Sequence, residues 1–162
     1  MNAASRYRCM EPNYWAERLT MARAKDALHR AVFEVGDEQW EGIVRRRRRK
    51  LFGLILPDAP VIDIGCAWGW NRDVMPESYR GRYVGIDICP EFIDMAQERY
   101  PADTWLLMDA RKTLFSDLEF DHAMLGSIKG MLISHKGLDA WEEVEREVNR
   151  IAKQMHILEY NE

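Results

Sequence analysis

The 162-residue sequence has few of the features that mark secreted, membrane-spanning or metal-binding proteins. Its three cysteines, Cys9, Cys66 and Cys89, are widely spaced without a C-x-x-C pair, which indicates neither a disulfide framework nor a zinc site. The longest apolar run, residues 51–57, is far shorter than the roughly 20 residues of a membrane span. Residues 1–15 lack a signal-peptide apolar region. We therefore expect a cytoplasmic protein with no metal and no membrane span.

Outside one short segment, acidic residues clearly outnumber basic ones. The chain has 23 Lys and Arg against 27 Asp and Glu, and six of the basic residues are consecutive, from Arg45 to Lys50. Such a run can bind the phosphates of nucleic acids. Apolar residues recur at helical spacing through residues 40–55, however, so a helix beginning at Asp37 would leave most of the run in solvent. On that helix Arg47 lies near the apolar side and is expected to snorkel to water. Both interpretations stay open.

The character of the chain changes at Pro60. Before it, residues 14–32 and 37–55 have helical patterns. After it, short apolar runs alternate with helical stretches, which is typical of a parallel sheet covered by helices. The spacing predicts strands over residues 61–64, 83–86, 104–107, 120–125 and 155–160, and helices over residues 91–99 and 139–153. We expect a single α/β domain with an N-terminal helical extension (residues 1–59) and a core (residues 60–162) built on a mostly parallel sheet of about five strands.

The residues that follow three predicted strands indicate a ligand site. Small residues at positions 65, 67 and 69 follow the first strand and let the backbone approach a nucleotide-like ligand. Asp87 lies 22 residues after Gly65, and Asp109 lies 22 residues after Asp87. Because the carboxyl ends of parallel strands converge in one crevice, these acids are expected to share it, and Asp87 suits ribose hydroxyls. The sequence has neither G-x-G-x-x-G nor G-K-[ST], which favours a ligand with ribose and adenine but no phosphate.

These segments resemble the class I S-adenosylmethionine-dependent methyltransferases. Residues 61–69 are similar to the first motif of that family, residues 83–96 to its second strand and following helix, residues 106–110 to its adenine-binding segment, and residues 120–125 to its fourth strand. The resemblance covers about residues 60–160. It implies S-adenosyl-L-methionine as cofactor and a Rossmann-like three-layer sandwich.

The resemblance also implies a role for individual residues. The methionyl part would face Asp63 and the loop residues Gly65, Cys66, Ala67 and Gly69, the ribose would face Asp87, the adenine would face Ile88, Asp109 and Ala110, and the sulfonium would lie near Gly126. Ala67 departs from the family, in which glycine is usual. We expect its methyl group to fit only if the local backbone avoids positive φ.

The predicted reaction requires few catalytic side chains. Methyl transfer is a direct displacement, so a base is needed only for an acceptor that must lose a proton. His135, expected in a loop after the fourth strand, is the candidate base, and His122 within that strand is a weaker one. Residues 126–131 contain neither [DNS]-P-P-[YFW] nor a Pro-Cys pair, which are signatures of DNA methylation. A small-molecule acceptor is therefore favoured.

Two alternative functions and one partner, a second copy of the chain, stay open. The family core usually has seven strands, whereas this sequence ends directly after the fifth predicted strand, so we expect an exposed sheet edge that a homodimer could cover. An incomplete acceptor wall would suit a protein that binds S-adenosylmethionine without transferring its methyl group, as a regulatory module or a cofactor-consuming enzyme. The run from Arg45 to Lys50 would suit a nucleic-acid methyltransferase.

Overall fold

The computed structural model describes residues 17, 19–20, 37–51 and 53–158 of the chain. In chain order the elements are α4 (Asp37–Leu51), β1 (Val61–Ile64), the 3-10 helix η2 (Trp70–Val74), β2 (Tyr83–Asp87), α5 (Pro90–Arg99), β3 (Thr104–Leu107), β4 (Phe120–Gly126), α6 (Ile128–Lys136), α7 (Leu138–Ile151) and β5 (Ala152–Leu158). The helix predicted over residues 14–32 lies almost entirely outside the described residues. None of the described helices is long and apolar enough to cross a membrane.

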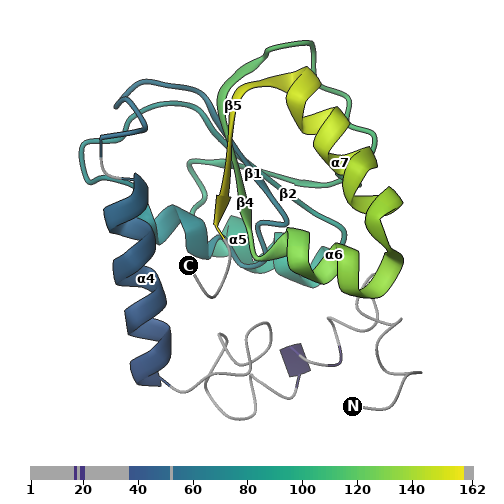
Figure 1. Ribbon diagram of the computed structural model, residues 1–162. Helices are drawn as coiled ribbons and strands as arrows, with labels where there is room; N and C mark the ends of the chain where they lie inside the picture. Colours follow the sequence, from purple (N-terminus) through teal and green to yellow (C-terminus); the bar gives the residue numbers. More distant parts are fainter. Residues whose placement is uncertain (1–16, 18, 21–36, 52, 159–162) are drawn as a thin grey trace.

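The five strands form one parallel sheet in the order β3-β2-β1-β4-β5 (Figure 1). Val61 at the start of β1 pairs with Tyr83 of β2 on one side and with His122 of β4 on the other. The strand order therefore reverses next to β1. In open α/β sheets, a crevice for ligands opens at the carboxyl ends of the strands at such a reversal. The predicted α/β fold with a five-stranded, mostly parallel sheet is confirmed.

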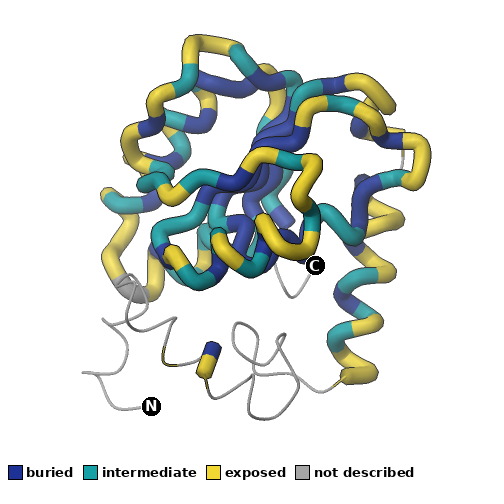
Figure 2. The backbone as a smooth tube through the Cα atoms, turned by 180° about the vertical axis from the view of Figure 1, so that it is seen from behind, coloured by how far each residue is buried: buried dark blue, intermediate teal, exposed yellow. Residues whose placement is uncertain are grey.

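Helices cover both faces of the sheet and bury its strands (Figure 2). On one face, α7 packs Trp141, Val144 and Val148 against apolar strand residues such as Ile62 and Ile64. On the other face lie residues of α4 and α5, including Leu51 and Ala96. All four residues of β1 are buried, as expected for the central strand of a parallel sheet between two helical layers. The fold is thus the three-layer arrangement that the sequence predicts.

Helix α4 corrects two expectations. It ends at Leu51 rather than near Ile55, because Gly53 takes up a left-handed conformation with φ 78° that ends a helix. Its buried residues Ile43, Arg47 and Leu51 lie four apart and form one stripe. The prediction that Arg47 snorkels to water is wrong, since Arg47 is only 3% exposed. Its guanidinium finds buried hydrogen-bond partners instead.

Two further boundaries differ from the sequence prediction. His135, expected in a loop after the fourth strand, lies in helix α6 (Ile128–Lys136). Strand β5 begins at Ala152, three residues before the predicted start, and α7 ends at Ile151. The difference arises because Ala152 pairs with Phe120 at the start of β4, and this tertiary contact ends the helical pattern. The segment after the first strand is a short 3-10 helix.

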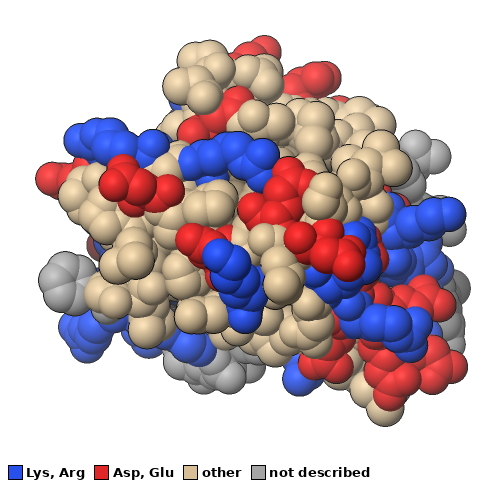
Figure 3. All heavy atoms as spheres, turned by 90° about the horizontal axis from the view of Figure 1, so that it is seen from above, with Lys and Arg blue, Asp and Glu red and all other residues tan. Residues whose placement is uncertain are grey.

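The amino ends of the strands carry ion pairs, whereas the carboxyl ends carry a cavity. At the amino ends of the strands, ion pairs such as Arg82–Glu119 (2.7 Å) and Lys153–Asp121 (2.6 Å) neutralise charge locally. Figure 3 looks onto this end and shows acidic and basic side chains interspersed. The carboxyl ends carry the cavity described next.

Candidate functional site

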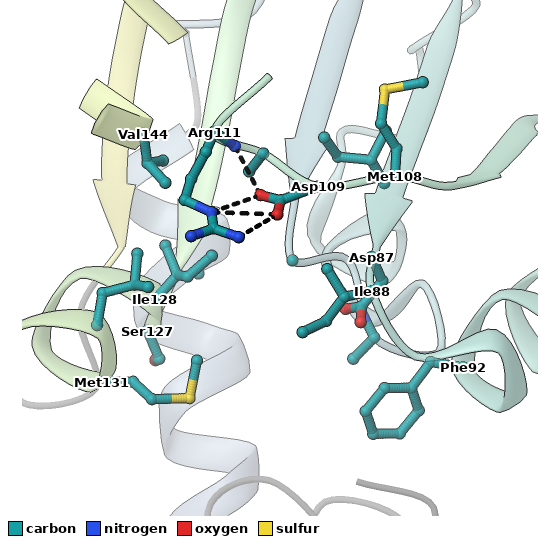
Figure 4. Close-up of a pocket in the computed structure, with 16 residues that line it drawn as sticks. Asp87, Ile88, Phe92, Met108, Asp109, Arg111, Ser127, Ile128, Met131 and Val144 are labelled. Carbon is teal, nitrogen blue, oxygen red and sulfur yellow. Dashed lines mark hydrogen bonds and ion pairs between the residues drawn. The ribbon is translucent and has the colours of Figure 1, made fainter. Parts of the chain in front are cut away.

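A cavity opens at the carboxyl ends of the strands (Figure 4). It encloses about 730 Å³ of space free of protein atoms, part of it open to solvent. Its walls come from the loops after β1, β2, β3 and β4 and from helices α5, α6 and α7. The lining residues are Gly65, Ala67, Ile86, Asp87, Ile88, Phe92, Met108, Asp109, Ala110, Arg111, Gly126, Ser127, Ile128, Met131, Leu132 and Val144.

Most of the residues singled out from the sequence meet at this cavity. The lining contains Gly65, Ala67, Asp87, Ile88, Asp109, Ala110 and Gly126. The other three predicted cofactor residues, Asp63, Cys66 and Gly69, are absent from this lining. They have other roles, Asp63 in β1 and Cys66 and Gly69 in the loop that follows it.

Asp87 connects β2 to the loop that follows β1. Its carboxylate accepts hydrogen bonds from the backbone N–H of Ala67 (2.9 Å) and from that of Cys89 (2.9 Å). Burial raises the pKa of the Asp87 carboxyl, although these N–H donors act in the opposite direction. A carboxylate has about four lone-pair positions, so one that already holds two backbone donors can still accept ligand hydroxyls.

The loop from Gly65 to Gly69 is wound tightly through three left-handed residues, with φ of 67° at Gly65, 48° at Ala67 and 77° at Gly69. The backbone N–H groups of Gly65 and Cys66 both donate to the Ile86 carbonyl of β2. The expectation that the methyl group of Ala67 fits only where the backbone avoids positive φ is wrong, because Ala67 occupies this position at φ 48°. In this conformation, which L side chains rarely adopt, the Ala67 N–H donates to Asp87.

Asp63 forms the centre of a buried polar cluster rather than part of the cavity wall. Its two carboxylate oxygens accept hydrogen bonds from Asn71 Nδ2 (2.8 Å) and from the Tyr83 hydroxyl (2.9 Å). Complete burial raises the pKa of Asp63 to about 7, although both hydrogen bonds and the Arg47 charge lower it. Asp63 therefore holds η2 and the loop before it onto the sheet.

Cys66 and Gly69 have structural explanations as well. Burial raises the pKa of the fully buried Cys66 thiol well above its ordinary value, which leaves the thiol unreactive. A Cβ at Gly69 would lie 2.8 Å from the ring of Trp105, so glycine is needed there for packing as well as for its positive φ.

A charged pair closes one end of the cavity. Arg111 Nη2 lies 2.5 Å from Asp109 Oδ2, and Arg111 Nε donates to both oxygens of the same carboxylate (Figure 4). These hydrogen bonds lower the pKa of Asp109. Asp109 is thus an ionised acceptor at the cavity rim, and Arg111 is a neighbour that the sequence analysis missed.

Apolar side chains form most of the remaining wall. Ile88 and Met108 lie on the side of β2 and β3, while Ile128 and Met131 come from α6 (Figure 4). The α6 residues were missed because that segment was interpreted as a loop. The spacing of Ile128, Met131 and Leu132, at i, i+3 and i+4, is the helical signal that could have identified them.

The two histidine candidates lie on different elements, His122 in β4 and His135 in α6. His122 is buried in β4, and its Nδ1 lies 3.0 Å from Nε2 of His156 in β5. Burial lowers the pKa of both imidazoles. His135 belongs to α6, and its side chain lies outside the described part of the structure.

Comparison with known protein families shows to which family this fold and cavity belong. A family model described as "Methyltransferase domain" matches residues 61–155, which run from the start of β1 into β5 and include the whole cavity wall. The chain belongs to the methyltransferase domain family. No curated protein matches it.

Solved structures share the fold of this methyltransferase domain. A Pyrococcus horikoshii protein is 22% identical with a TM-score of 0.63, over 80% of this chain and 65% of that one. The [4+2]-cyclase SpnF is 15% identical with a TM-score of 0.60, over 70% and 43%. A Haemonchus contortus phosphoethanolamine N-methyltransferase, solved with phosphoethanolamine and S-adenosylhomocysteine, is 17% identical with a TM-score of 0.65, over 97% and 33%. The chain thus spans from one third to about two thirds of these proteins.

Proposed function

We propose that this methyltransferase domain binds S-adenosylmethionine and transfers its methyl group to a small-molecule acceptor. The observation that carries the proposal is Asp87, whose carboxylate holds the loop at Ala67 by a 2.9 Å hydrogen bond and also lines the cavity. A carboxylate in this place after the second strand suits the two hydroxyls of a ribose. Family membership and the absence of a phosphate-binding motif support the same ligand.

The cavity offers a suitable group for each part of the proposed ligand. Ile88, Met108 and Val144 provide apolar walls for a planar base. Asp109 beside them is ionised and would accept a hydrogen bond from the adenine amino group, sharing its oxygens with Arg111. Gly65 and Gly126 line the cavity with backbone, which would face the methionyl part.

Little acid–base chemistry is required of the protein. The sulfonium of the bound cofactor supplies an activated methyl group, so the chain needs only to align the acceptor and exclude water. Phe92 and Met131 stand at the end of the cavity away from Arg111 (Figure 4) and would supply apolar surface there. His135 stays a candidate base for acceptors that must lose a proton.

The basic run gives limited support to nucleic-acid methylation. Arg47 is buried, Arg48 donates to the Asp73 carbonyl, and Lys50 donates to the Ile157 carbonyl. Half of the run is therefore engaged with the protein itself. We propose instead that residues 1–59 serve as a cap whose helix α4 packs on the methyltransferase core.

A second candidate is cofactor binding without methyl transfer. The observation that favours it is the similar fold of SpnF, which is named a [4+2]-cyclase.

One assay separates the two functions. The protein is incubated with S-adenosylmethionine and a panel of small alcohols, amines, thiols and carboxylic acids, and S-adenosylhomocysteine and methylated product are measured. We expect both products in equal amounts with one acceptor class and a large decrease in the Asp87→Ala variant. Tight binding of S-adenosylmethionine without either product across the panel would contradict methyl transfer and favour the second candidate.

A further inference from the structure

One arginine of the basic run differs from its neighbours because its side chain is buried. Arg47 is 3% exposed, whereas Arg46 and Arg48 on the same helix are exposed. Taking a charge out of water is costly unless hydrogen bonds and a counter-charge compensate for it. The position of Arg47 in α4 therefore needs a reason beyond solubility.

The guanidinium of Arg47 ties α4 to three other segments. Its Nη2 donates to the Ser127 hydroxyl (2.8 Å) and to the Leu158 carbonyl (2.6 Å) at the ends of β4 and β5. Its Nη1 donates to Asn71 Oδ1 (3.1 Å) in η2. The group also lies over the ring of Trp70, 4.0 Å from the ring centre. A guanidinium is planar and has several N–H donors, so it can make these contacts together. The ammonium group of a lysine cannot.

These contacts lie directly behind the cavity wall. Gly126 and Ser127 both line the cavity. A Cβ on Gly126 would lie 2.8 Å from Arg47 Nη1 and 2.9 Å from Asn71 Nδ2, so the guanidinium and the amide pack against the glycine backbone. Ser127 has φ 60° and ψ 23°, a left-handed conformation that costs a serine energy. The turn keeps this conformation while the Ser127 N–H donates to Leu158 O (3.0 Å) and the hydroxyl accepts from Arg47.

The same group is linked to the end of β1. Asn71 accepts from Arg47 through Oδ1 and donates through Nδ2 to Asp63. The buried cation is thus linked through one amide to a buried acid. Asp63 lies in β1, two residues before Gly65, and both Gly65 and Gly126 line the cavity at its proposed methionyl end.

We propose that Arg47 is a positioning residue of the cofactor site, which fixes the Gly126–Ser127 turn so that the turn fits the amino-acid half of S-adenosylmethionine. This inference rests on the proposed function. The adenosine half would lie against Asp87, Ile88 and Asp109, whereas the hydrogen bonds of Arg47 named above go to Asn71, Ser127 and Leu158. Loss of the guanidinium should therefore weaken the binding of one half of the ligand selectively.

The test compares two ligands that share the adenosine half. S-adenosylhomocysteine carries the amino-acid group, and 5′-methylthioadenosine lacks it. Calorimetry on the full chain gives the dissociation constant of each ligand for wild type, Arg47→Met and the control Arg46→Met, which changes an exposed arginine of the same helix. For Arg47→Met we expect S-adenosylhomocysteine affinity to fall about tenfold, as for one lost charged hydrogen bond, and methylthioadenosine affinity to change less than about twofold. Arg46→Met should change neither.

The outcomes separate this inference from the proposed function. Wild type that binds neither ligand overturns the proposed function and the inference with it. Wild type that binds both, with Arg47→Met losing both equally or neither, overturns the inference alone. If Arg47→Met does not fold, Ser127→Ala removes one of the same hydrogen bonds. It should weaken S-adenosylhomocysteine about threefold and spare methylthioadenosine, and equal effects on both ligands would contradict the proposal.

Discussion

Replacing Ala67 by glycine tests whether the loop after β1 stores backbone strain. Ala67 has φ 48°, and the left-handed conformation costs an L residue about 1–2 kcal/mol relative to glycine. Two effects oppose this gain. Removing the methyl group forfeits about 0.8 kcal/mol of burial. The greater freedom of glycine in the unfolded chain costs about 0.5–1 kcal/mol. The gain of about 1–2 kcal/mol and the combined losses of about 1.3–1.8 kcal/mol nearly cancel, so Ala67→Gly should change the free energy of unfolding by less than about 0.8 kcal/mol.

Ala59 provides a matched control. Both alanines are 5% exposed and lie outside helices and strands, but Ala59 is not among the residues with positive φ. Ala59→Gly loses the buried methyl group and adds the freedom of glycine to the unfolded chain, without relieving any left-handed backbone. It should therefore destabilise the protein by about 1.5 kcal/mol.

Urea unfolding followed by tryptophan fluorescence measures the difference between the two variants. A cost at position 67 equal to that at position 59 would refute the strain argument.

Two other substitutions test the packing around the loop. For Asp63 the folded-state pKa is about 7, above its unfolded value of about 3.9, so the folded protein binds the proton more tightly and stability falls as pH rises between these values. Because asparagine cannot titrate, wild type should lose about 1 kcal/mol per pH unit relative to Asp63→Asn between pH 5 and 7 in urea titrations, and a constant difference would contradict this. A Cβ at Gly85 would overlap the Trp105 ring, so Gly85→Ala should cost about 2–3 kcal/mol. Trp105→Leu should cost less stability in the Gly85→Ala background than in wild type, and strictly additive losses would argue against the clash.

The central strands and α5 were predictable because local signals determine them. Strands β1 and β3 match their predicted bounds, and β2 and β4 extend one residue further. Their continuous apolar runs follow from burial on both faces of a parallel sheet. Pro90 and Pro101 delimit α5 because proline favours a first helical turn and prevents continuation.

The features that sequence reasoning missed depend on tertiary contacts. Arg47 is charged, and its burial is explained only by partners such as Asn71 and Ser127, 24 and 80 residues away in the chain. Asp63 looked like a ligand-facing acid because nothing in its local sequence shows that Tyr83 and Asn71 donate to it.

Helix α6 was missed for a different reason. It is short, begins after a left-handed Ser127 and contains Gly130, so its local propensity is low. Packing of Leu132 into the core on the α7 side of the sheet accompanies its helical structure.

Titration with S-adenosylmethionine and S-adenosylhomocysteine tests the central claim most directly. Wild type, Asp87→Ala and the control Asp94→Ala, an exposed acid in the following helix α5, are compared by calorimetry, with thermal unfolding as a check on folding. We expect wild type and Asp94→Ala to bind both ligands with dissociation constants well below about 1 mM. Asp87→Ala should bind about a hundredfold more weakly, since it loses two charged hydrogen bonds to the ribose. Wild type that binds neither ligand near about 1 mM, or Asp87→Ala that binds as tightly as wild type, would contradict it.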